Sequence, residues 1–203
     1  MSGRLITFEG IDGAGKSTHI DWYADRLRAR GLEVLLTREP GGTPLAERLR
    51  DLLLAEQMSI ATETLLMFAA RNEHLDRSIR PALARGAWVI CDRFTDSTYA
   101  YQGGGRGVSF ERIEQMEAWV HGDLQPRRTY LFDLPAEVAA QRRAAAREAD
   151  RFEAEDLAFF ERVRDAYRAR QAGDPARILP IDALRSIDDI RKTLEEDLAS
   201  LCS

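Results

Sequence analysis

The sequence predicts a single α/β domain built around a five-stranded parallel sheet. Short apolar runs rich in β-branched residues alternate with longer helical patterns, which is the order that stacked β-α units produce. The chain has 203 residues, of which 44% are hydrophobic and 31% charged, enough for one full core. No repeat, linker or low-complexity tract divides the sequence, so we interpret residues 1–203 as one domain.

Five short segments are predicted to form the strands of this sheet. They are apolar and hardly alternate with polar residues, as expected for strands covered on both faces. The predicted strands span 5–9, 34–38, 88–92, 129–133 and 178–182. Four of them end in an acidic residue. Ligands of open parallel sheets bind at the carboxyl ends of the strands, so these carboxylates indicate a site there.

Helical patterns fill most of the remaining sequence. We expect helices at 16–30, 44–54, 62–85, 109–121, 135 to about 147, 156–171 and 186–201. A glycine directly follows three of these segments, which is a common helix stop. Three stretches are predicted to be irregular, namely 39–43, the glycine-rich 103–107 and the arginine-rich 142–151. Long loops on a rigid scaffold are where we expect the chemistry.

Residues 10–18 read Gly-Ile-Asp-Gly-Ala-Gly-Lys-Ser-Thr, between the first predicted strand and the first predicted helix. This is the phosphate-binding loop G-x-x-x-x-G-K-[ST] in its required context, and it predicts a three-layer P-loop NTPase fold. Its backbone N–H groups and the following helix N-terminus favour bound phosphate. The expected nucleotide-binding residues are Gly10, Ile11, Asp12, Gly13, Ala14, Gly15, Lys16, Ser17 and Thr18, with Lys16 at the terminal phosphates and Ser17 on Mg²⁺.

Lysine is rare in this chain. Only Lys16 and Lys192 occur among its 29 basic residues, so arginine is used nearly everywhere else. A compact ammonium on a flexible stem can enter the loop, whereas a planar guanidinium has no room there. This choice supports a functional Lys16.

Further motifs separate the classes of P-loop protein. A GTPase needs an Asn-Lys-x-Asp guanine reader, but the only asparagine is Asn72, which Glu73 follows. The chain is short for an ATPase machine with an output domain, so a small-molecule kinase is favoured. Asp92 ends the third strand, where it can hold Mg²⁺ directly or through water. Arg93 follows and can bridge an acceptor phosphate and the group in transit, although a strand-end ion pair is the alternative.

Composition excludes several other classes. The net charge of −5 and the pI near 5.4 argue against a partner that is a nucleic-acid polymer. Cys91 and Cys202 have no metal-ligand spacing and make an unlikely disulfide, which suggests a reducing cytoplasm. The N-terminus enters the first strand at once, and no apolar run approaches the ~18 residues of a membrane span. We therefore expect neither a signal peptide nor membrane insertion.

The segment 90–102, Ile-Cys-Asp-Arg-Phe-Thr-Asp-Ser-Thr-Tyr-Ala-Tyr-Gln, resembles the signature of thymidylate kinases. Segments 8–18, 37–43, 68–71, 101–107 and 150–153 resemble the bacterial branch of that family, in the same order. The resemblance covers nearly the whole chain. It implies transfer of the γ-phosphoryl of ATP to dTMP with Mg²⁺, and a homodimer. The alternatives are another nucleotide or nucleoside kinase, and a nucleotide-binding regulator that has lost the reaction.

The resemblance also assigns substrate contacts. Arg71 and Gln102 match the residues that read the thymine edge, and Tyr101 matches the ring that excludes a ribose 2′-hydroxyl. Asp12 matches the acid near the 3′-hydroxyl, and Arg93 the residue on the dTMP phosphate. Arg38, Arg50 and Thr98 are further candidates for substrate binding, with a solvated role as the alternative for Arg50. Met67 stands where many relatives have an aromatic residue on the base; it or Phe68 could cover thymine, or both could belong to the core.

The arginine-rich stretch resembles the family's mobile lid over ATP, at about 142–155. Some relatives carry an arginine in the phosphate loop, whereas others have a small residue there and supply the arginine from the lid. Gly13 places this chain in the second group. Arg147 and Arg151 are then the expected charge-stabilising arginines, with a solvated basic helix face as the alternative.

Overall fold

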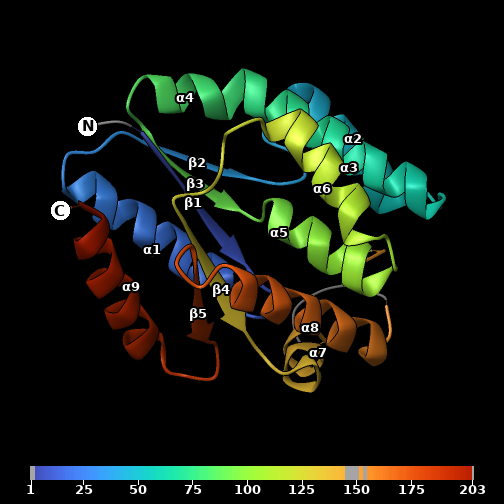
Figure 1. Cartoon of the computed structure of the whole chain (residues 1–203). Coiled ribbons are helices and arrows are strands. Elements are labelled where there is room, and N and C mark those ends of the chain that lie inside the picture. The colour runs from blue at the N-terminus through green and yellow to red at the C-terminus, as the bar shows by residue number, and fades with distance from the viewer. Residues whose placement is uncertain (1–2, 145–150, 153–154, 203) are drawn as a thin grey trace.

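A five-stranded, fully parallel sheet in the order β2-β3-β1-β4-β5 forms the centre of the fold (Figure 1). The computed structural model describes residues 3–144, 151–152 and 155–202. Its strands are β1 (Arg4–Glu9), β2 (Val34–Arg38), β3 (Trp88–Asp92), β4 (Arg128–Asp133) and β5 (Ile178–Asp182). All five predicted strands are confirmed, and β1 and β4 each begin one residue earlier than expected. The predicted fold class is therefore correct.

The three central strands, β1, β3 and β4, are buried on both faces, and their successive side chains point to opposite sides of the sheet. On one side Leu5 and Val89 pack against Leu75 and Ile79. On the other side Ile6, Phe8 and Ile90 belong to a larger core, together with the apolar side chains of helix α1. Because both faces of these strands are covered, their sequences are mostly apolar and do not alternate with polar residues.

Helices cover the sheet on both sides, which gives the predicted three layers (Figure 1). Helices α1 (Lys16–Ala29) and α9 (Ile187–Cys202) lie beside each other on one side. Helices α4 (Arg80–Ala84) and α8 (Leu157–Gly173) contact the strands on the other side. Helix α3 (Ile60–His74) packs against α2 (Pro44–Ala55) and α6 (Phe110–His121), and α7 (Ala136–Ala144) packs against α8. None of the helices in the described part of the chain has the length and hydrophobicity of a membrane span.

The helix expected at 62–85 contains a π-helical turn. It begins at Ile60, where Ser59 Oγ accepts a hydrogen bond from Thr62 N at 3.2 Å. Helix α3 then runs into η1 (Leu75–Ile79), and α4 follows. Pro81 lacks an N–H group and its ring crowds the preceding turn, so the wider π turn before it lets the helix continue.

The glycine-rich segment 103–107 is not the loop that we predicted. Helix α5 (Thr95–Thr98) continues into a second π-helix, η2 (Tyr99–Gly105), which includes the first three of these glycines. A side chain on Gly104 would collide with Ala166 and the backbone of α8, and one on Gly105 would collide with Phe159. These glycines therefore permit close packing of η2 against α8. Sequence propensity alone predicts a loop for the same glycines.

Candidate active site

The site lies where the strand order reverses. β1 and β3 are neighbours, with Phe8 paired to Asp92. The phosphate loop follows β1, whereas Arg93 follows β3, so both segments reach the same edge of the sheet. A cavity of about 900 Å³ opens there. A crevice outside the carboxyl ends of the strands at such a switch point is the usual ligand site of an open parallel sheet.

The phosphate loop leaves backbone donors for a ligand. Gly10 has φ 133°, and a side chain there would collide with the Phe132 carbonyl. Gly15 precedes α1 with φ 86°, in the left-handed region that glycine adopts at little cost. No side chain in the described residues caps the N-terminus of α1. Its first N–H groups are therefore available to phosphate oxygens.

Most of the predicted nucleotide-binding residues line the cavity, namely Asp12, Gly13, Gly15, Lys16, Ser17 and Thr18. Ile11 and Ala14 instead pack into the core, and Gly10 is not among the lining residues. Lys16 is buried, with Nζ 3.1 Å from the Gly10 carbonyl oxygen and 4.0 Å from a carboxylate oxygen of Asp92. Burial, and then the charge of Arg93, lower the pKa of the Lys16 ammonium. A bound phosphate would offset both effects.

Arg93 is fixed within the cavity by side chains from three segments. Its Nη2 donates to Asp12 Oδ1 at 2.7 Å and to the Tyr101 hydroxyl at 3.2 Å. Tyr101 in turn donates to Asp12 Oδ2 at 2.9 Å. Burial opposes ionisation of Asp12, but the charges of Arg93 and Lys16 outweigh it and lower the pKa of that carboxyl. Arg93 itself has φ 67°, an uncommon backbone conformation for a residue other than glycine.

The sequence did not reveal the network behind Arg93. Glu9, which is 0% exposed, accepts hydrogen bonds from Phe94 N at 2.7 Å, Ser97 Oγ at 2.5 Å and the Tyr167 hydroxyl at 2.9 Å. Ser97 and Tyr167 each also accept a hydrogen bond from Arg93 Nη1 at 3.2 Å. Glu9 therefore holds the arginine through two hydroxyl groups. The only indication of this role in the sequence was that Glu9 is one of the acidic residues that end the predicted strands.

Glu9 makes the stability of the fold depend on pH. Burial, and then the charge of Asp96, raise its pKa from 4.5 to about 7, so the folded protein keeps a proton that the unfolded chain releases between these values. The resulting stabilisation is present below pH 4.5 and is lost as pH rises through 7. It is of the order of 3 kcal/mol. Between pH 5 and 8 we expect the unfolding free energy of wild type to fall relative to that of Glu9→Gln.

Urea unfolding at pH 5, 6, 7 and 8 checks this expectation. The exposed Glu111→Gln is the matched control and should keep the pH dependence of wild type. Parallel curves for wild type and Glu9→Gln across this range would show that Glu9 does not titrate there.

The residues expected to contact the second substrate also line the cavity. They are Arg38, Arg50, Met67, Arg71, Thr98, Tyr101 and Gln102. Phe68 does not line the cavity but packs with Tyr99 and Ile113 in a small buried cluster. The Arg71 guanidinium carbon lies 5.0 Å from the centroid of this ring, so Phe68 makes a cation–π contact with that arginine. Between the two candidates for covering the base, the structure brings only Met67 to the cavity wall.

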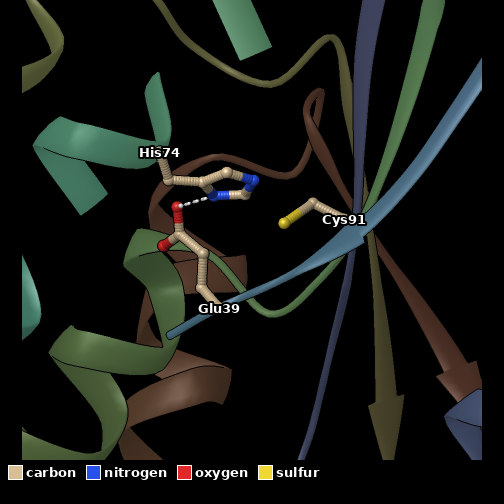
Figure 2. Close-up of side chains that lie close together, drawn as sticks. All are labelled: Glu39, His74 and Cys91. Carbon is tan, nitrogen blue, oxygen red and sulfur yellow. Dashed lines mark hydrogen bonds and ion pairs between the residues drawn. The ribbon is translucent and has the colours of Figure 1, made fainter. Parts of the chain in front are cut away.

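Arg71 is held by a buried carboxylate that the sequence did not single out. Its Nε donates to Glu39 Oε2 at 2.6 Å, and its Nη1 donates to Thr98 Oγ1 at 3.0 Å. His74 Nδ1 shares a hydrogen bond with the other Glu39 oxygen at 3.0 Å, as Figure 2 shows. Burial opposes ionisation of Glu39, yet Arg71 and His74 outweigh it and lower its pKa. The Arg71 guanidinium is therefore oriented before any ligand binds.

Glu39, His74 and Cys91 bring three potential metal ligands within 4.8 Å of one another (Figure 2). Both nitrogens of His74 are already engaged, Nδ1 with Glu39 and Nε2 with Thr37 Oγ1 at 2.7 Å. The Cys91 thiol donates to the Arg93 carbonyl at 3.0 Å, and burial raises its pKa well above the usual range. The cluster therefore serves as a hydrogen-bonded support for Arg71, and we assign it no metal.

The arginine-rich stretch contributes Arg142 to the cavity wall. Arg151 lies elsewhere, since its Nη2 donates to Glu63 Oε2 at 2.7 Å and its Nε donates to the Leu53 carbonyl at 2.9 Å. It lines a second cavity of about 420 Å³ and not the main one. Arg147 lies outside the described residues. In this arrangement Arg151 therefore lies outside the wall of the main cavity, and its expected role at the phosphate stays a prediction.

A phosphate loop, a strand-end Asp-Arg pair and a second polar pocket in the same cavity define a P-loop kinase of the nucleoside monophosphate class. The protein-family model described as Thymidylate kinase matches residues 8–194 of this chain. The chain therefore belongs to the thymidylate kinase family.

Individual relatives agree with this assignment along the whole chain. It is 61% identical over 205 residues to the thymidylate kinase of Ralstonia nicotianae, with 99% of this chain and 100% of that protein covered. It is 62% identical over 201 residues to the thymidylate kinase of Cupriavidus metallidurans, with the same coverage. Among solved structures, the thymidylate kinase of Ehrlichia chaffeensis superposes with a TM-score of 0.80 at 34% identity, covering 98% of this chain and 99% of that one.

Proposed function

We propose that this enzyme transfers the γ-phosphoryl of ATP to the 5′-phosphate of dTMP, giving dTDP and ADP. The observation that carries this proposal is that one cavity holds the phosphate-loop Lys16 together with the polar pair Arg71 and Gln102. Thymine offers the O4 acceptor and the N3–H donor that a guanidinium and an amide carbonyl can satisfy. Among the residues that the structure describes, six cationic and four acidic side chains line the cavity, an excess of positive charge that suits two phosphate-bearing ligands.

The acceptor range of the purified enzyme tests this function. ADP release is measured with dTMP, dUMP, dCMP, AMP and thymidine at equal concentrations. We expect dTMP to give the highest kcat/KM. If any other acceptor gave a higher kcat/KM, that compound and not dTMP would be assigned as the substrate.

Positioning and electrostatics account for the reaction. A phosphate oxygen of dTMP attacks the γ-phosphorus as the bond to the bridging oxygen of ADP breaks, so no side chain needs to remove a proton. Lys16 would bind the transferred and leaving phosphates, and Arg93 would bridge the acceptor phosphate and the group in transit. Asp12 holds Arg93 in place before either substrate binds. Charge that develops on the phosphoryl oxygens thus meets donors that are already oriented.

Ser17 and Asp92 are the residues that would hold Mg²⁺. Both line the cavity, and Asp92 Oδ1 is buried with no hydrogen-bond partner in the described part of the chain. A buried carboxylate oxygen without a hydrogen bond is costly, and a cation or its bound water would satisfy it. The donor set, a hydroxyl and a carboxylate, suits this ion. When bound, it would neutralise charge on the phosphate oxygens.

Tyr101 would select deoxyribose. Its ring is 6% exposed and packs edge-on against Phe159 and Tyr167, while Asp12 and Arg93 hold its hydroxyl. Such a ring cannot move aside for an added 2′-hydroxyl group on the sugar.

For the lid, we expect Arg151→Ala to lower kcat by about 10²-fold while changing the KM for dTMP much less, because its guanidinium would stabilise charge on the transferred group. In this structure Arg151 is paired with Glu63, so that ion pair would have to open first. Arg162→Ala, which removes an exposed arginine beside η2, is the control for kcat. An unchanged kcat in Arg151→Ala would remove this residue from the catalytic groups.

The exposed apolar side chains on α3 and α6 support a homodimer. Ile60 and Leu65 are 46% and 59% exposed, and Phe110 and Trp119 are 41% and 86% exposed. These two helices pack against each other, so the four side chains lie on adjoining elements. Exposed clusters of large apolar residues commonly mark protein contacts. A sedimentation mass equal to the 22.9 kDa chain at micromolar concentration would contradict the dimer.

A cytoplasmic location fits this function. ATP and deoxynucleotides are intracellular substrates, and both Cys91 and Cys202 are free thiols. Recovery of the protein with the membrane fraction or the culture medium would contradict this location.

A further inference from the structure

The carboxylate of Glu63 links Gln102 in the wall of the main cavity to Arg106 and Arg151 in the wall of the second cavity. Glu63 lies in the first turn of α3 and is 1% exposed. Its Oε1 accepts hydrogen bonds from Gln102 Nε2 at 2.9 Å and from Arg106 Nε at 2.8 Å. Its Oε2 accepts from Arg151 Nη2 at 2.7 Å. Buried carboxylates are retained only when they are paired and hydrogen-bonded, as this one is.

The bond between Glu63 and Gln102 decides which way the amide points. A carboxylate is an acceptor only, and within an amide group only the nitrogen donates. The Nε2 atom of Gln102 must therefore face Glu63, and its Oε1 atom is the opposite end of the same group. This Oε1 has no hydrogen-bond partner in the part of the chain that the structure describes, although the side chain is 1% exposed and lines the main cavity. Gln102 thus offers a ligand an acceptor and not a donor.

We propose that Glu63 is a specificity-determining positioning residue, which makes Gln102 an obligatory hydrogen-bond acceptor and so admits thymine but rejects cytosine. The inference rests on the proposed function. Thymine carries an N3–H donor that matches the Gln102 carbonyl, whereas N3 of cytosine is an acceptor and would face that carbonyl unpaired. Burying two acceptors against each other loses both hydrogen bonds. Sites that read a polar group in this way discriminate strongly against substrates that lack it.

Glu63→Gln tests the proposal. A glutamine at this position can either accept or donate, so the amide of Gln102 could turn and present Nε2 to the base. We expect the ratio of kcat/KM for dTMP to that for dCMP to fall by at least about tenfold. A change that acts through Arg151 would affect both acceptors alike and would cancel in this ratio. A ratio within twofold of wild type would overturn the proposal.

Arg106→Gln is the matched control, since it removes another partner of the same Glu63 oxygen but leaves Gln102 fixed. It should keep the wild-type ratio within about threefold; an equal loss in this variant would show that Glu63 acts only through general packing. The double variant Glu63→Gln with Gln102→Glu restores an obligatory acceptor facing the base. It should recover discrimination against dCMP, and failure to do so would count against the proposed orientation.

Glu63→Asp covers the case in which Glu63→Gln does not fold. It keeps the charge beside both arginines but withdraws the carboxylate from Gln102 by one methylene, so the ratio should fall in the same direction. An unchanged ratio would overturn the proposal. Turnover of dTMP by wild type tests the proposed function independently of all these variants.

Discussion

Replacing Lys16 by methionine should lower kcat by about 10³-fold and leave the protein folded. Methionine keeps the length of the side chain but removes the charge that would bind the transferred and leaving phosphates. The loss should appear mainly in kcat, because negative charge shifts among these oxygens as the reaction proceeds. The backbone donors of the loop and the N-terminus of α1 remain, so binding of ATP should weaken less than turnover.

The same substitution should not lower the melting temperature. Without a ligand, burial and the neighbouring charge of Arg93 both disfavour the Lys16 ammonium, whose pKa is lowered. The interactions that favour the ammonium are a hydrogen bond to the Gly10 carbonyl, an ion pair with Asp92 at the 4.0 Å limit and the charges of Asp12 and Glu9. An apolar side chain of similar volume removes the cost of burying this ammonium, which offsets the loss of its attraction to the carboxylates.

Steady-state kinetics and a thermal melt of the purified variant check both expectations. The chain offers a matched control, because Lys192 is its only other lysine and is exposed on α9. Lys192→Met should leave kcat and melting temperature as in wild type. A kcat for Lys16→Met within tenfold of wild type would exclude Lys16 from the transfer step.

The fold could be predicted closely because its signals are local and strong. All five strands follow from short apolar runs, of which those of β1, β3 and β4 are covered on both faces. The phosphate loop follows from glycines at fixed spacing. The structure departs from prediction where packing decides. Gly104 and Gly105 signal a loop by propensity, yet they belong to the π-helix η2, and they are glycines because α8 lies too close for any side chain. No local pattern reports that neighbour.

The residues expected to contact ligands could be predicted from the sequence, whereas the residues that hold them in place could not. Lys16, Arg71 and Arg93 stand within motifs that carry their chemistry. The carboxylates that hold Arg71 and Gln102 could not be assigned in the same way. Glu39 and Glu63 are two acidic residues among the chain's 34, and they lie 32 and 39 residues away in sequence from Arg71 and Gln102 respectively. The position of Arg151 was also beyond the sequence, because it depends on the partner that Glu63 offers.

Arg93→Met should lower kcat/KM for dTMP by about 10³-fold, the range in which a single charge-stabilising arginine acts. The guanidinium is set by four side chains, with Asp12 and Tyr101 on Nη2 and Ser97 and Tyr167 on Nη1. Its removal takes away a phosphate ligand and also a positive charge that lies 2.7 Å from the Asp12 carboxylate. Repulsion between that carboxylate and the substrate phosphates should then raise the KM for dTMP as well as lower kcat.

Arg93→Lys separates these two effects. A lysine keeps a positive charge beside Asp12 but cannot form the planar fork that bridges two phosphoryl groups, so kcat should still fall by about 10²-fold while the melting temperature stays near that of wild type. Arg164→Met is the control for losing an Arg-Asp ion pair, because Arg164 binds Asp133 at 2.6 Å with similar exposure and does not line the cavity. That variant should keep wild-type kcat. Full activity in Arg93→Lys would mean that a point charge suffices at this position and that bridging by the guanidinium plays no part.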